Sequence, residues 1–158
     1  MEVDLKNKPK DLLELNPYAK VPVLVDGAGV IYESAIINEY LDEKFPELPI
    51  LPKNALQRAK ARIWVDFLNS RLHPAVSDIT HDREPDRARQ RLQQHLDTLE
   101  TELIGKQFIV GNYSLADVSF IPFYARRQRY GVTIDDNFPN LKRWGEELMA
   151  RPAVTSTL

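Results

Sequence analysis

The 158-residue sequence contains no cysteine, and this absence removes several kinds of chemistry at once. A chain without cysteine has no disulfide framework, no CxxC redox centre, no thiolate zinc site and no cysteine nucleophile. Histidine is scarce too, since His73, His81 and His95 are the only three. Their spacing does not resemble a metal site, so we expect solvent-facing or partly packed histidines and no bound metal.

Long apolar runs and an excess of one charge are also missing. No run approaches the roughly 18 residues of a membrane-spanning helix, and the first residues lack the apolar core of a signal peptide. With 21 Lys and Arg against 23 Asp and Glu, the net charge is −2. This balance gives no reason to expect nucleic acid or a membrane as a partner, and a cytoplasmic location is the default.

The sequence has two regions that differ in residue pattern. Residues 1–45 mix short apolar runs with turn residues, whereas residues 54–158 consist mainly of long charged helical segments. Three prolines between residues 45 and 52 exclude a helix and stiffen an extended connection. We therefore predict domains at 1–45 and 54–158, joined by a linker at 46–53.

The first region reads as a short α/β segment. Apolar patterning predicts a helix over 8–15, a strand over 21–25 and a return strand over 30–32. Residues 26–29, Asp-Gly-Ala-Gly, predict the hairpin turn between them. A helix over 34–44 follows, with Ser34 well suited to the N-cap position.

The second region reads as a helical bundle. Apolar periodicity predicts helices over 54–72, 85–103, 114–129 and 140–150. His73-Pro74 is expected to end or kink the first of these. The helix over 114–129 is too apolar for a one-sided surface helix, so we expect it to be central and buried.

The dipeptide Val21-Pro22 is the first motif with chemical meaning. X-Pro bonds are the only peptide bonds that adopt the cis form at low cost. A cis bond just before a strand can turn the Val21 N–H and C=O outward, where they can accept an extended peptide as one more antiparallel strand. The alternative is an ordinary trans proline at a strand start.

Glu33-Ser34 is the second such motif. A serine at a helix start can cap its own helix, but the hydroxyl, the free N–H groups and the dipole can also hold a carboxylate. A neighbouring glutamate can pair with an amine. An α-amino acid offers both charges on one carbon, so this dipeptide suits such an end group.

The order of these elements strongly resembles the second half of the thioredoxin-like domain of glutathione S-transferases. Residues 111–117, Gly-Asn-Tyr-Ser-Leu-Ala-Asp, resemble the capping motif before that family's central helix, and residues 138–144 and 151–154 resemble its C-terminal run. The resemblance implies a truncated thioredoxin-like α/β domain followed by the family's all-helical C-terminal domain. In a capping box, Ser114 and Asp117 would hold the fold without touching substrate.

The resemblance also implies a glutathione site. Val21 would pair through its backbone with the cysteinyl unit of glutathione, and Pro22 would be the family's cis-proline. Glu33 and Ser34 would hold the γ-glutamyl end. Glutathione is then a co-substrate, and no further cofactor is implied.

Two lysines and two segments have weaker assignments by the same resemblance. Lys20 could reach the glycine carboxylate of glutathione, and Lys8 is a weaker candidate, although a solvated surface role suits both equally. Residues 64–72 and 124–130 are plausible walls for a hydrophobic electrophilic small molecule. The basic run within 124–130 also suits a solvated helix end.

The pattern departs from the family at its start. A thioredoxin-like domain opens with a βαβ unit of about 30 residues, of which this sequence holds at most the tail at 2–5. Family members carry their catalytic Tyr, Ser or Cys at the end of that first strand, so we expect it upstream of Met1 and assign no catalytic residue. The hairpin is then expected to be weakly stable.

Two functions remain open at this point. The first is a glutathione transferase, a homodimer like its family, that conjugates the glutathione thiol to electrophiles. The alternative is a non-catalytic binding or scaffold protein that keeps the fold.

Overall fold

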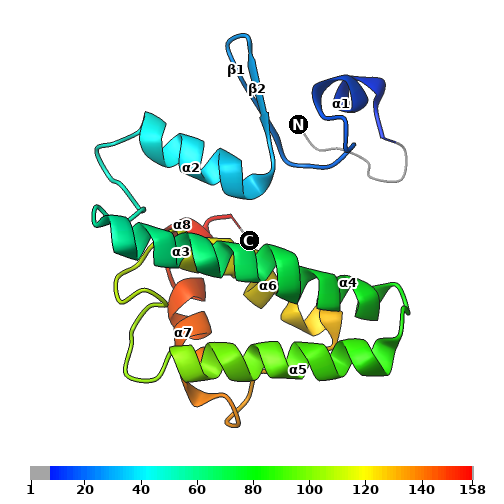
Figure 1. The fold of residues 1–158 in the computed structure, drawn as a ribbon, viewed down its shortest axis with the longest axis vertical. Helices are drawn as coiled ribbons and strands as arrows, with labels where there is room; N and C mark the ends of the chain where they lie inside the picture. The colour runs from blue at the N-terminus through cyan, green and yellow to red at the C-terminus, as the bar shows by residue number, and fades with distance from the viewer. Residues whose placement is uncertain (1–7, 158) are drawn as a thin grey trace. The chain divides into compact units, whose positions relative to one another are not determined.

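The computed structural model describes residues 8–157, so the segment 2–5 considered above lies outside them. The chain divides into two compact units, Met1–Pro49 and Ile50–Leu158 (Figure 1). The division falls within the proline-rich segment expected as a linker.

The N-terminal unit holds a two-stranded antiparallel hairpin between two helices. Its described elements are α1 (Lys10–Leu15), β1 (Val23–Asp26), β2 (Gly29–Tyr32) and α2 (Ser34–Lys44). Each strand lies within two residues of its predicted bounds, and the pairing runs from Val23↔Tyr32 to Asp26↔Gly29. Gly27 has a φ of 60°, the positive value that tight hairpin turns need.

The turn end of the hairpin is tied to α2. Tyr40 Oη and Lys44 Nζ both donate hydrogen bonds to Asp26 Oδ2. The bond from Lys44, followed by that from Tyr40, lowers the pKa of the Asp26 carboxyl. Sheet and helix are thus joined by side chains at the end of the hairpin remote from Val21 and Glu33.

The C-terminal unit is all helical. Its elements are α3 (Ala55–Phe67), a π-helical turn (Leu68–Leu72), α4 (His73–Thr80), α5 (Pro85–Glu102), α6 (Leu115–Arg126), a 3₁₀ turn (Arg127–Tyr130), α7 (Pro139–Met149) and α8 (Pro152–Thr155). One continuous apolar cluster fills the unit. Phe120 of α6 and Trp144 of α7 meet edge to face within it, with centroids 5.6 Å apart, and α6 is buried as predicted.

Two predicted helix ends differ from the structure. Of the two outcomes expected at His73-Pro74, an end or a kink, the end is wrong, because a π turn lets α4 follow α3 directly, as Figure 1 shows. Pro74 sits in the first turn of α4, where its missing N–H costs no hydrogen bond. The α-helix that begins at Leu115 ends at Arg126, after which the chain tightens into the 3₁₀ turn.

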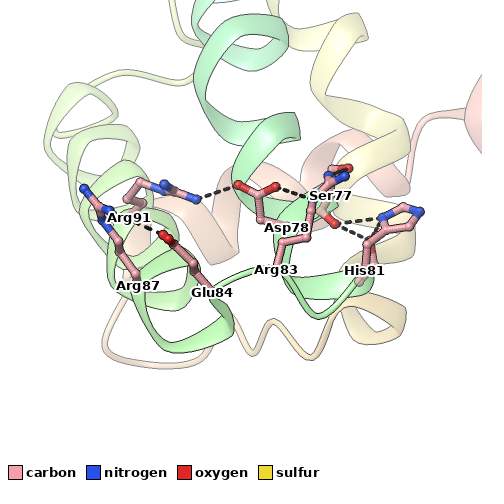
Figure 2. Close-up of polar contacts among 8 residues, drawn as sticks. Ser77, Asp78, His81, Arg83, Glu84, Arg87 and Arg91 are labelled. Carbon is pink, nitrogen blue, oxygen red and sulfur yellow. Dashed lines mark hydrogen bonds and ion pairs between the residues drawn. The ribbon is translucent and has the colours of Figure 1, made fainter.

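The turn between α4 and α5 is held by a group of charged side chains (Figure 2). Asp78 accepts hydrogen bonds from Arg83 Nε at 2.9 Å and from Arg91 Nη2 at 2.6 Å. Arg83 Nη2 also donates to Ser77 Oγ at 2.9 Å. Because the hydrogen-bonding groups of these side chains pair with one another, we interpret the cluster as one that stabilises the turn.

The predicted capping box at Ser114 and Asp117 is present. Asp117 Oδ2 accepts from the Ser114 N–H at 2.8 Å and from Ser114 Oγ at 3.0 Å. Its Oδ1 accepts from the Ile109 N–H at 3.1 Å and from Trp144 Nε1 at 2.9 Å. Burial raises the pKa of the Asp117 carboxyl although all four bonds lower it. The carboxylate therefore joins α6, α7 and the preceding loop.

Two further contacts place α7. Glu100 of α5 accepts hydrogen bonds from Asn140 N at 3.1 Å and Leu141 N at 2.8 Å, which satisfies N–H groups at the start of α7. At Gly145 a Cβ atom would lie 1.8 Å from Tyr124 Cε2, so only glycine permits this approach of α7 to α6. Within residues 8–157, no helix is long and apolar enough to cross a membrane.

Candidate functional site

The backbone at the start of α2 differs from the sequence prediction. Ser34 is the first helical residue, and Glu33 takes the N-cap position, where its carbonyl accepts from the Ile37 N–H at 2.9 Å. No side chain caps this end. The prediction of Ser34 as N-cap is wrong because the chain leaves β2 at Tyr32 and turns at the very next residue.

Glu33 achieves this turn with an unusual backbone. Its φ is 71° and its ψ is 114°, a combination that side chains with a Cβ rarely adopt. Such strain costs on the order of 1–3 kcal/mol and clusters at ligand clamps and active sites. An exposed glutamate held in this way marks the start of α2 as a candidate binding position.

The start of α2 has the chemistry to hold an anion. An α-helix leaves its first N–H groups without helical partners, and its dipole favours negative charge there. Ser34 is exposed, and within residues 8–157 its hydroxyl makes no hydrogen bond. The uncapped helix start can therefore give its N–H groups and a hydroxyl to a ligand carboxylate.

Val21-Pro22 is cis, as predicted. The β1–β2 pairing begins at Val23, so Val21 lies just outside the ladder, and its side chain is exposed. Because Val23 pairs with Tyr32, the residues before β1 and those after β2 emerge at one end of the hairpin. The two dipeptides singled out in the sequence, Val21-Pro22 and Glu33-Ser34, therefore lie at the same end of the hairpin.

Asn16 organises the loop that leads to Val21, and sequence reasoning missed it. It is 1% exposed, donates from Nδ2 to the Lys20 carbonyl at 2.8 Å, and accepts the Tyr18 N–H on Oδ1 at 3.0 Å. The available signal was the Asn16-Pro17 dipeptide, which marks turns.

The two lysine candidates for glutathione binding have fewer contacts that fix their positions. Lys20 and Lys8 are both exposed, and neither forms an ion pair within the described part of the chain. Lys20 directly precedes Val21, whereas Lys8 lies before α1 with no contact that links it to the hairpin end. No group of three or more His, Asp or Glu residues within 8–157 could hold a metal ion.

The two proposed walls both lie in the helical unit. Trp64 and Phe67 meet edge to face at 5.1 Å. In the second wall, the Arg127 guanidinium lies 4.1 Å from the Tyr124 ring centroid and donates to the Tyr124 carbonyl at 2.8 Å. Arg127 thus has a structural contact at the helix end, whereas the solvated helix end was the alternative expected for the basic run as a whole.

Comparison with known proteins decides the family. Residues 1–44 match the family described as glutathione S-transferase, N-terminal domain, and residues 67–152 match glutathione S-transferase, C-terminal domain. The chain is 33% identical over 166 residues to glutathione S-transferase U25 of Arabidopsis thaliana, across 99% of this chain and 75% of that protein. The chain belongs to the glutathione S-transferase family.

Solved structures agree with this assignment. The ternary complex of BphK, a bacterial glutathione S-transferase, is 26% identical with a TM-score of 0.89, and the match covers 99% of this chain and 83% of that one. Ure2p in complex with glutathione has a TM-score of 0.86 at 24% identity, over 95% and 80% of the two chains. The family's fold, a thioredoxin-like segment followed by a helical domain, is therefore confirmed.

Proposed function

We propose that this chain binds glutathione at the end of the hairpin and acts as a glutathione transferase on electrophilic small molecules. The observation that carries the proposal is the placement of Val21-Pro22 and Glu33-Ser34 at the same end of the β1–β2 pairing. In the reaction, the glutathione sulfur, as thiolate, attacks an electrophilic carbon, and the leaving group departs with the bonding electrons.

The cysteinyl unit and the γ-glutamyl end of glutathione each have a complementary group at this position. The Val21 N–H and C=O pair with the cysteinyl backbone in the manner of an added strand. The γ-glutamyl carboxylate is held by Ser34 and the start of α2, and its amine pairs with the Glu33 carboxylate. The strained turn at Glu33 supports this assignment because no side chain caps the start of α2.

Further parts of the proposal rest on the family alone. Lys20, and more weakly Lys8, reach the glycine carboxylate, while the second substrate is a hydrophobic electrophile. The proposal also includes a homodimer, as the family resemblance implies, and a cytoplasmic location. No residue within 8–157 is assigned to stabilising the thiolate.

Calorimetric titration with glutathione tests the proposal, with turnover of a generic aromatic halide as the second measurement. The Glu33→Gln variant removes the charge that pairs with the amine, and we expect it to weaken binding at least about tenfold, which is about 1.4 kcal/mol. Glu43→Gln is the matched control, because Glu43 is an exposed glutamate of the same helix.

The outcomes separate the possible functions. Binding with turnover above the uncatalysed rate supports the transferase. Binding without turnover favours the non-catalytic alternative for this chain. An unaltered chain that does not bind glutathione, or a Glu33→Gln variant that binds as well as Glu43→Gln, contradicts the proposed site.

A further inference from the structure

Asn16 is the one buried polar side chain among the described residues of the N-terminal unit. All of its polar groups are engaged. Its N–H donates to the Leu12 carbonyl at 2.9 Å and its carbonyl accepts from the Ala19 N–H at 2.8 Å. Its side chain bonds the Tyr18 N–H and the Lys20 carbonyl, as described above. The loop 16–20 is therefore folded around this one amide.

The hydrogen bond from Asn16 to the Lys20 carbonyl also fixes the orientation of the Val21 N–H. The Lys20 C=O and the Val21 N–H belong to one planar peptide unit, and this bond is not among the cis bonds of the structure. In a trans peptide the C=O and N–H point in opposite directions. Because buried Asn16 holds the carbonyl, the Val21 N–H points away from Asn16.

We propose that Asn16 is a positioning residue for glutathione, which presents the Val21 N–H to the cysteinyl unit by anchoring the other face of the same peptide. This inference rests on the proposed function. Asn16 touches no substrate and acts only through the orientation of Val21. Side-chain amides suit this task, because Nδ2 donates to Lys20 while Oδ1 accepts from Tyr18.

The variant Asn16→Asp separates the two side-chain bonds. A carboxylate keeps an acceptor for the Tyr18 N–H but places an oxygen where Nδ2 now donates to the Lys20 carbonyl. Two facing acceptors repel, so the Lys20–Val21 peptide should rotate. Asn38→Asp is the matched control, since it makes the same change of charge at a partly buried position of α2.

Calorimetry with glutathione on the three proteins gives the first readout. We expect Asn16→Asp to raise the dissociation constant at least about tenfold, or about 1.4 kcal/mol, and Asn38→Asp to change it less than about twofold. If the unaltered chain binds and the two variants bind alike, the inference alone is overturned. If the unaltered chain does not bind, the proposed function falls and the inference with it.

Amide resonances give a second readout, which reports on the Val21 N–H itself. On the unaltered chain, glutathione should shift the Val21 amide resonance strongly. In ligand-free Asn16→Asp, the Val21 resonance should move while those of β1 and β2 stay in place. A Val21 amide that does not respond to bound glutathione overturns the inference, and this measurement holds even if Asn16→Asp fails to fold.

Discussion

Among the described residues of the N-terminal unit, the buried apolar side chains are Leu12 and Ile37. The helical unit instead encloses a continuous cluster drawn from α3, α4, α5, α6 and α7. Exposed large apolar residues are more numerous in the N-terminal unit, whose described residues hold nine of them, whereas the helical unit has Leu56, Ile63 and Ile104. Apolar burial is the main stabilising contribution to folding. The stabilising free energy is therefore concentrated in the helical unit.

The proposed glutathione contacts all lie in the more lightly packed N-terminal unit. They consist of a peptide outside a strand ladder, a strained turn and an uncapped helix start. Regions that bind ligands are commonly drawn from the less stable parts of a structure. In contrast, the buried polar groups of the helical unit, Ser114 and Asp117, are fully used within the fold. The comparison predicts that equivalent changes in the two units have different effects.

The largest effect is expected from Trp144→Ala in the helical core. Trp144 is 1% exposed, and truncating a buried tryptophan typically costs about 3–5 kcal/mol of unfolding free energy. Urea denaturation followed by circular dichroism measures the loss. Trp144→Phe keeps an aromatic ring but removes the donor to Asp117, so it should cost about 1–3 kcal/mol. Equal losses in the two variants would contradict this account of the core.

The next effect concerns the hairpin. An isolated two-stranded hairpin is marginal in water, so amides of residues 23–32 should exchange with solvent at least about 100-fold faster than those of α6, a gap of about 2.7 kcal/mol. Native-state hydrogen exchange on a monomeric sample measures the difference. Equal protection in both segments would show that the two units are equally stable, which would contradict the proposed difference in stability.

Sequence reasoning recovered features governed by local rules. The Asp-Gly hairpin and the capping box follow from turn and cap chemistry within a few residues. At His73-Pro74 the sequence left an end or a kink of the helix open, and it did not predict the π turn at Leu68–Leu72 through which α3 continues into α4. Its occurrence depends on how both helices pack.

The sequence allowed the two dipeptides of the candidate site to be predicted. It did not allow prediction of the backbone turn and the loop hydrogen bonds around them. Val21-Pro22 and Glu33-Ser34 stand out in the sequence, and strand register brings them together. The N-cap position at Glu33 was missed, since it depends on where β2 ends. The role of Asn16 depends on a bond between side chain and backbone across a loop, which an Asn-Pro dipeptide alone does not specify.

A smaller effect is expected from Gly145→Ala. The added Cβ would overlap the Tyr124 ring, and such overpacking typically costs about 1–3 kcal/mol. In a Tyr124→Ala background the same change should be neutral or stabilise by up to about 1 kcal/mol, because alanine favours helix over glycine. Thermal denaturation of the four proteins measures this coupling. An additive result would mean that α6 and α7 do not meet at these residues.

The smallest effects come from two serines at helix starts. Ser114 accepts the Ala116 N–H at 3.2 Å as the N-cap of α6, so Ser114→Ala should cost about 1–2 kcal/mol. Ser34 caps nothing, so Ser34→Ala should change stability by less than about 0.5 kcal/mol while weakening glutathione binding. Denaturation and calorimetry on both variants measure the two properties separately. A destabilising Ser34→Ala with unchanged glutathione affinity would reverse the assignment, because the hydroxyl would then serve the fold in both units.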